Sequence, residues 1–145
     1  MEPSVTGARL VVDPASVTPD PRVPGSGVVQ LHVVVPPSER DLRWGVAGIV
    51  ERSDGGRWIP AGSFALSLEK WGGTGRVAAP GEPLTVRRIG LGADAAGHGP
   101  LGRLDLAGLA PGSYRLVQQG RTDTDPPTGS GRQIVGHVEV AASPG

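Results

Sequence analysis

Glycine and proline stand so close together along this chain that no helix of ordinary length fits between them. The longest stretch free of both is nine residues, Ser63 to Trp71. A helix interior disfavours Pro by about 3 kcal/mol and Gly by about 1 kcal/mol relative to Ala. Helices also average about 11–12 residues. The chain is therefore expected to be all-β, with helix as a minor element.

The 24 Gly and 15 Pro residues also raise the alternative of a disordered chain. Disorder usually accompanies few apolar residues and a high net charge. Here 37% of the residues are hydrophobic, and 14 basic residues balance 14 acidic ones. A folded chain is the better interpretation. The length of 145 residues predicts a single domain over residues 1–145, with a core that spans about 7–141.

Apolar and polar residues alternate between the breakers, as half-buried strands require. The alternation is clearest in Ala8 to Val12, Val29 to Val35 and Phe64 to Leu68. Further expected strands begin at Leu42, Leu84, Leu101, Tyr114 and Ile134. About eight short strands separated by turns are typical of a β-sandwich or barrel. We therefore predict seven to nine antiparallel strands.

Four segments between the expected strands carry turn or loop signals. Ser53 to Gly56 predicts a hairpin turn, because Gly accepts the positive φ that such turns need. Asp13 to Gly27 holds four prolines and predicts an extended connection along a sheet edge. Gly90 to Pro100 and Thr122 to Arg132 predict loops, and the second of these contains no apolar residue.

Two motifs resemble those of bacterial immunoglobulin-like (Ig-like) domains. The stretch Leu10 to Pro19, followed by Val28 to Val35, resembles their first two strands, where a proline breaks the opening strand so that it can switch sheets. The stretch Leu106 to Val117 resembles their "L-x-P-G-x-Y" corner. There Pro111-Gly112 would turn the chain, and Tyr114 would pack inward and bond a backbone group a few residues upstream.

The layout is also similar to the intracellular proteinase inhibitor family of bacilli. That family shares a "P-G-E" turn before a strand, here Pro80-Gly81-Glu82, and the same corner. Both resemblances imply an Ig-like Greek-key β-sandwich. It would lack the cysteine pair of antibody domains, because the chain has no cysteine. They imply a fold more than a function, since such sandwiches host many roles.

Composition excludes or disfavours several classes of function. The absence of cysteine excludes disulfides, thiolate zinc sites and thiol catalysis. Zero net charge disfavours a nucleic-acid partner, which needs a basic face. The sequence contains no stretch of 18 apolar residues, so no membrane span is predicted. Met1 to Leu10 lacks the basic and apolar regions of a signal peptide.

No catalytic residues are expected. The chain has no G-x-S-x-G motif, and its histidines, His32, His98 and His137, lie far apart in the sequence. Gly90 to Ala95 fits a loose dinucleotide pattern, but that pattern needs a helix N-terminus to receive the pyrophosphate. Gly97, Gly99 and Pro100 forbid such a helix. We therefore predict that the chain is not an enzyme and carries no cofactor.

No metal site is predicted, because the candidate clusters are too small. Asp94 and His98 share a glycine-rich loop, but two ligands are too few. Asp123 and Asp125 have a spacing found in calcium sites. Arg121 and Arg132 flank them and offer neutralising partners instead. Whether this loop binds calcium stays open.

The expected binding residues lie on loops, because strands use their apolar faces for the core. Trp71, followed by two glycines, is a candidate for partner contact. The loop between the last two strands is the second candidate, through Arg121, Asp123, Asp125 and Arg132. Trp44 is expected in the core, and Trp58 at a sheet edge after the hairpin turn.

Taken together, these features predict a non-catalytic Ig-like binding or structural module with a protein partner. It would belong to a bacterial cell-envelope or secreted protein, and so work outside the cytoplasm, with the virion or the cytoplasm as alternative locations. One alternative is a proteinase inhibitor that acts through the loop Thr122–Arg132. Another is a virion or appendage protein that decorates a larger assembly.

Overall fold

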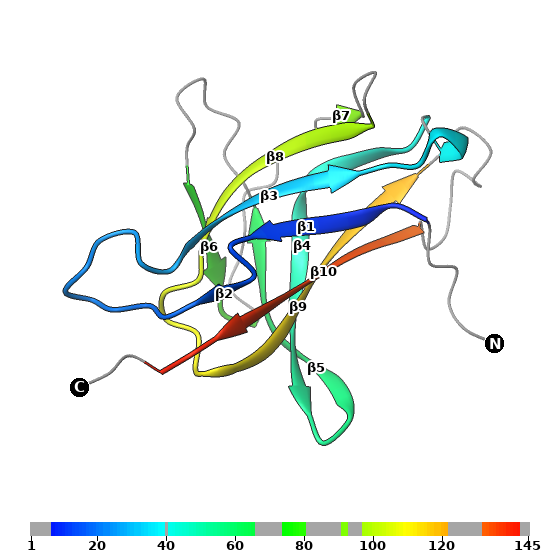
Figure 1. Ribbon diagram of the computed structural model, residues 1–145. Coiled ribbons are helices and arrows are strands. Elements are labelled where there is room, and N and C mark those ends of the chain that lie inside the picture. The colour runs from blue at the N-terminus through cyan, green and yellow to red at the C-terminus, as the bar shows by residue number, and fades with distance from the viewer. Residues whose placement is uncertain are drawn as a thin grey trace.

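The computed structural model describes residues 7–39, 41–65, 74–80, 91–92, 97–121 and 132–142, and these form an all-β fold (Figure 1). The strands are β1 (Arg9–Asp13), β2 (Ser16–Val17), β3 (Val28–Val34), β4 (Arg43–Asp54), β5 (Arg57–Ala65), β6 (Thr74–Ala78), β7 (Leu91–Gly92), β8 (His98–Asp105), β9 (Gly112–Arg121) and β10 (Arg132–Val140). One 3-10 turn, Pro37–Glu39, is the helical element of this part of the chain. The described residues contain no helix long and apolar enough to cross a bilayer. The prediction of an all-β fold is confirmed.

Neighbouring strands hydrogen-bond in the order β1-β3-β8-β6-β5-β4-β9-β10-β2, and β7 pairs with the start of β4. Strand β1, at one end of this order, packs against β10 near the other end. The sheet therefore curls almost into a closed barrel (Figure 1). The buried hydrophobic residues form one core inside it.

The prediction of seven to nine antiparallel strands was wrong in number and in two pairings. Ten strands lie in the described residues, and β2 pairs with β10, and β6 with β8, in parallel. The first parallel pairing follows from the broken opening strand. Strand β2 keeps the direction of β1 but joins the opposite end of the strand order, beside β10. Alternation along a strand carries no information about the direction of its neighbour.

The opening strand breaks at Pro14, as the resemblance to Ig-like domains implied. Strand β1 pairs with β3 as far as Asp13 opposite Gln30, and β2 then pairs with β10. Pro14 follows Asp13 through a cis peptide bond and has no N–H to give to a sheet. The segment Asp13–Gly27 is therefore more than a connection. It contains β2 and then a turn in which the Val23 N–H donates to the Asp20 carbonyl.

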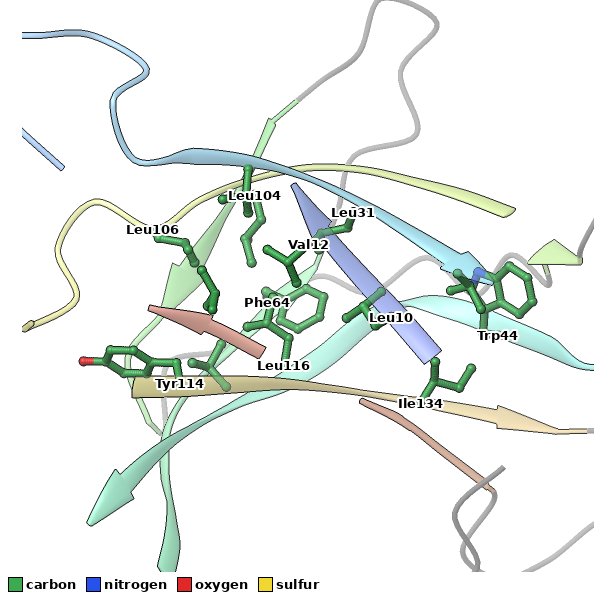
Figure 2. Packing of buried hydrophobic residues seen from close by; sticks show 14 of the residues in the cluster. Leu10, Val12, Leu31, Trp44, Phe64, Leu104, Leu106, Tyr114, Leu116 and Ile134 are labelled. Atoms are coloured by element: carbon green, nitrogen blue, oxygen red, sulfur yellow. The ribbon is translucent and has the colours of Figure 1, made fainter. Parts of the chain in front are cut away.

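The predicted inward-facing residues form one core. Those confirmed as buried are Ala8, Leu10, Val12, Val29, Leu31, Val33, Val35, Leu42, Trp44, Val50 and Phe64. Trp44 and Tyr114 lie toward opposite ends of this core, with Phe64 and Leu116 between them (Figure 2). The predicted inward positions Leu66 and Leu68 and the strand expected from Leu84 lie outside the described residues.

Two of the predicted turns and loops can be compared with the structure. Gly55 and Gly56 have φ of 57° and 85° and connect β4 to β5, so the hairpin turn is confirmed. The loop predicted over 90–100 is too long, because β7 covers Leu91–Gly92 and β8 begins at His98. Pro100 is tolerated within β8 because the pairing with β3 is irregular beside it.

Tyr114 forms the expected corner between β8 and β9. Its ring is 2% exposed, and its hydroxyl donates a 2.5 Å hydrogen bond to the carbonyl oxygen of Ala110. Pro111 is exposed in the turn, and β9 begins at Gly112. The side chain at the start of β9 thus holds the backbone that leads into it.

Gly136 allows β1 to close against β10. A Cβ at this position would lie 2.5 Å from the Leu10 carbonyl oxygen and 3.0 Å from the Leu10 Cβ. Both atoms belong to β1, which cannot move without disturbing its pairing with β3. A side chain at position 136 would therefore push the two strands apart.

We expect Tyr114→Phe to lower the free energy of unfolding by about 1 kcal/mol or somewhat more. The ring stays, but the Ala110 carbonyl loses its donor. The midpoint of urea unfolding should fall while the m-value stays unchanged. An unchanged midpoint would mean that the hydrogen bond contributes nothing to stability.

We expect Gly136→Ala to destabilise the fold by about 1–3 kcal/mol, the usual cost of overpacking a rigid contact. Equilibrium unfolding in urea measures this effect. A loss of less than about 0.5 kcal/mol would show that β1 can shift away from β10 at little cost.

Candidate functional site

The outward surface of strands β5, β4, β9 and β10 is the strongest candidate for a functional site; we call it the outer face. Alternation along β9 defines it, because Tyr114 and Leu116 point into the core. Arg115 and Val117 therefore point outward. The pairing of β9 with β4 on one side and with β10 on the other places their outward residues in rows across the strands.

The middle row of the outer face is aliphatic, and we call it the aliphatic row. Val117 lies directly opposite Ile49 of β4 and Val135 of β10. Such directly paired residues have Cβ atoms about 4.5–5.5 Å apart and contact each other. Val117 is only 5% exposed although it lies outside the core, whereas Ile49 is 45% exposed. Apolar surface thus reaches solvent at Ile49.

A row of charged and aromatic side chains lies beside the aliphatic row, and we call it the charged row. It consists of Glu51, Arg115 and His137, with the Trp58 ring above them. The Arg115 Nε donates a 2.5 Å hydrogen bond to Glu51 Oε1. The guanidinium carbon of Arg115 lies 5.0 Å from the centroid of the Trp58 ring. The Trp58 and His137 ring centroids are 5.7 Å apart, with the planes tilted by 50°.

These contacts fix the side chains of the charged row before any partner arrives. Arg115 is held by the Glu51 carboxylate and by the face of the Trp58 ring, a cation–π arrangement. Ordering a long side chain on binding costs about 0.5–1.5 kcal/mol. Much of that cost has already been met here by folding. The row suits recognition of a partner by a preformed surface.

The row on the other side of the aliphatic row carries amides and small side chains, and we call it the amide row. It contains Gln119, which pairs with Gln133 of β10, and Ala47 of β4, which pairs with Ala65 of β5. Gln119 is exposed, and Ala47 and Gln133 are half-buried. An amide both donates and accepts hydrogen bonds. The outer face is therefore charged on one side of the aliphatic row and neutral on the other.

The binding residues predicted from the sequence lie elsewhere or outside the described residues. Arg121 ends β9 and Arg132 begins β10, where Arg132 pairs with Gly120. The two ends of the predicted loop are thus held side by side. Trp71, Asp123 and Asp125 lie outside the described residues. The calcium site considered at Asp123 and Asp125 therefore lies outside them as well.

Trp44 lies where it was expected, and Trp58 does not. Trp44 is 2% exposed and belongs to the core. Trp58 was expected to pack at a sheet edge, but its ring lies against Arg115 and His137 of β9 and β10. A tryptophan side chain is long enough to cross neighbouring strands, and the distant residues it reaches depend on strand order.

Sequence reasoning missed the aliphatic row, although the sequence contains a signal for it. Leu116-Val117 and Ile49-Val50 are adjacent apolar pairs inside strands. Successive side chains of a strand point to opposite faces. One member of each pair must therefore face away from the core, and here these members are Val117 and Ile49.

A cavity lies at the end of the barrel near the Tyr114 corner. This cavity of about 430 Å³ lies between the segment Pro19–Gly27, the turn that follows β8, and Ala141–Ala142. Its two carboxylates are already engaged. Asp105 accepts the Ala107 N–H, and Asp20 binds the side chain and the backbone N–H of Arg22. These hydrogen bonds hold the pKa of Asp20 below its usual value.

No three His, Asp or Glu side chains gather closely enough to hold a metal ion in the part of the chain that the structure describes. The charged row holds one carboxylate and one imidazole, but Arg115 lies against the carboxylate.

Comparison of the chain with protein-family models, with curated proteins and with solved structures found no match.

A double-mutant cycle should show that the charged row is coupled. We expect Arg115→Met to cost about 1–2 kcal/mol, because it leaves the half-buried Glu51 carboxylate without its donor. Glu51→Gln should cost less, and the coupling energy between the two changes should be about 1 kcal/mol. Urea unfolding of the four proteins measures it. Strictly additive effects would mean that the ion pair does not stabilise the outer face.

Proposed function

We propose that this chain is a non-catalytic Ig-like module that binds a protein partner through the outer face. The observation that carries the proposal is the exposure of Ile49, 45%, at the end of a row that continues through Val117 and Val135. Protein interfaces combine an apolar centre with a polar rim. The outer face has the same arrangement, with the charged and amide rows on either side.

Three features support the Ig-like part of the proposal. Strand β3 pairs with β8, and β4 pairs with β9. Strands from the first half of the chain thus pair with strands from the second half. The opening strand divides between β3 and β10. The Tyr114 hydroxyl bonds the Ala110 carbonyl, as in the corner of such sandwiches. A setting in a bacterial cell envelope or a secreted protein is the further part of this proposal, and it rests on the resemblance alone.

A second candidate is a proteinase inhibitor that acts through the loop between β9 and β10. The observation that favours it is the pairing of Arg132 with Gly120, next to Arg121 at the end of β9. A loop mounted on two paired strands is presented with its ends fixed. Loss of protease inhibition on replacement of residues 125–130 by a short Gly-Ser turn would support this candidate over the outer face.

The proposed function can be tested with two matched substitutions. Ile49 and Val23 are the large hydrophobic residues with the greatest exposure among the described residues, at 45% and 53%. Val23 lies on the segment before β3, away from the outer face. Ile49→Arg places a charge in the aliphatic row, and Val23→Arg places the same charge elsewhere.

The wild-type chain and both variants would be immobilised and exposed to extract of the source organism, and the bound proteins quantified by mass spectrometry. We expect a protein that the wild type and Val23→Arg retain, and that Ile49→Arg retains at least about tenfold less. The purified protein should then show the same order of affinities by calorimetry. Equal retention on all three surfaces would exclude the outer face as the binding site.

A further inference from the structure

We propose that the cavity near the Tyr114 corner binds an organic cation, an ammonium group on an apolar stem. The cavity lies at the end of the barrel where β10 ends, and it shares no lining residue with the outer face (Figure 1). Its volume of about 430 Å³ is within the range of small-molecule sites, about 300–1,000 Å³. The proposal is carried by an apolar wall, a shortage of hydrogen-bond donors and one carboxylate without a cation.

Prolines form much of the cavity wall. Four of them line it, Pro19, Pro21, Pro24 and Pro111. Leu109, which is half-buried against the core, adds another apolar side chain. Proline rings are rigid and lose almost no side-chain entropy when they are covered. An apolar stem can therefore pack against them without first ordering the wall.

The two sides of the cavity are held together before any ligand arrives. The Leu106 N–H donates to the Gly27 carbonyl at 2.8 Å, which joins the turn after β8 to the segment before β3. Within that segment, the Ser26 hydroxyl donates to the Asp20 carbonyl and accepts from the Asp20 N–H. The cavity is thus a preformed part of the fold, and a ligand does not have to create it.

The wall offers few hydrogen-bond donors. Its four prolines have no N–H. Six more of its residues already donate their N–H groups within the protein: Asp20, Val23, Ser26, Ala107, Leu109 and Ala141. No Lys, Arg or His side chain is among the described residues that line it. An anionic ligand, which needs donors, is therefore disfavoured.

Asp105 adds a negative charge that no cation of the described residues balances. Its Oδ1 accepts the Ala107 N–H at 2.9 Å, and this donor is neutral. Arg76 of β6 lies opposite Asp105, but no ion pair joins these two residues. A Cβ at Gly27 would lie 3.2 Å from Asp105 Oδ1 and 3.3 Å from Pro19 Cβ. The carboxylate therefore lies beside the proline wall.

The second carboxylate of the cavity, Asp20, differs from Asp105 in this respect. Arg22 donates to both of its oxygens, at 3.1 and 3.2 Å, so Asp20 adds little net charge. The unbalanced charge of the cavity is that of Asp105. Hydrogen bonds between an ammonium group and a carboxylate are about twice as strong as those between neutral groups. A free amine and a lysine side chain of another protein both supply this chemistry.

Titration of the isotope-labelled full chain with hexylamine, followed by nuclear magnetic resonance, tests the proposal. Hexylamine is positively charged at neutral pH, as lysine is. We expect saturable shifts at the amides of Ala107, Gly108 and Leu109, with a dissociation constant of about 1–10 mM, because so small a ligand binds weakly.

Three further probes separate the charge from the stem and one source from the other. Hexanol has the same stem without the charge, and it should bind at least about tenfold more weakly than hexylamine. Ethylamine lacks most of the stem, and it should lose at least about tenfold as well. A lysine blocked at both ends represents a protein partner. Its affinity, compared with that of hexylamine, shows which of the two sources the cavity fits better.

Substitutions beside the carboxylate locate the site. Asp105→Asn removes the charge but keeps an oxygen for the Ala107 N–H, and it should weaken hexylamine binding about tenfold. Ala107→Lys, at an exposed position, supplies a cation from the chain itself and should weaken binding to a similar degree. Asp54→Asn, at the exposed end of β4, is the matched control and should change the affinity by less than about twofold.

The absence of saturable shifts up to about 50 mM hexylamine would overturn the inference. Equal affinities for hexylamine and hexanol would overturn it too, and so would undiminished binding by Asp105→Asn. Circular dichroism and the urea midpoint show whether each variant is folded. If Asp105→Asn does not fold, Ala107→Lys decides in its place, because unchanged hexylamine binding by that variant excludes the cavity as the site.

Discussion

The buried side chains of Tyr114 and Leu116 set which side of β9 faces the core, and the rest of the molecule depends on that choice. The phenol ring is buried, so residue 114 must point inward. A shift of β9 by one residue would exchange its two faces. Leu116 would then point to solvent, and Arg115 and Val117 would enter the core. The alternation along β9 thus sets the core and the outer face together.

The elements that the sequence predicts well are those governed by local chemistry. The hairpin turn at Gly55 and Gly56 was predictable because glycine accepts consecutive positive φ without strain. The buried positions of β3 followed from strict alternation. The break at Pro14 was implied by the resemblance to Ig-like domains, and its local cause is that proline has no N–H to donate to a ladder. Each of these depends on a few neighbouring residues, so no knowledge of distant contacts was needed.

The elements that the sequence did not predict depend on strand order. Nothing near Ser16 indicates that β2 pairs with β10, because the partner lies more than a hundred residues further along the chain. The charged row has the same origin. Trp58, Glu51, Arg115 and His137 come from four strands, and only the order β5-β4-β9-β10 brings them together. Binding was expected on loops, because the sequence of a single strand shows which side chains face solvent but not which side chains of other strands lie beside them.

The broken opening strand also determines how the fold carries a mechanical load. Strands β1, β2 and β10 run in the same direction, so the chain enters the barrel at one end and leaves it at the other (Figure 1). A pull between Arg9 and Val140 acts along these strands and loads the β2–β10 hydrogen bonds together in shear. Strands pulled apart from one end would break such bonds one after another. The parallel pairing of Val17 with Val140 thus resists separation of the two ends of the described fold under such a pull.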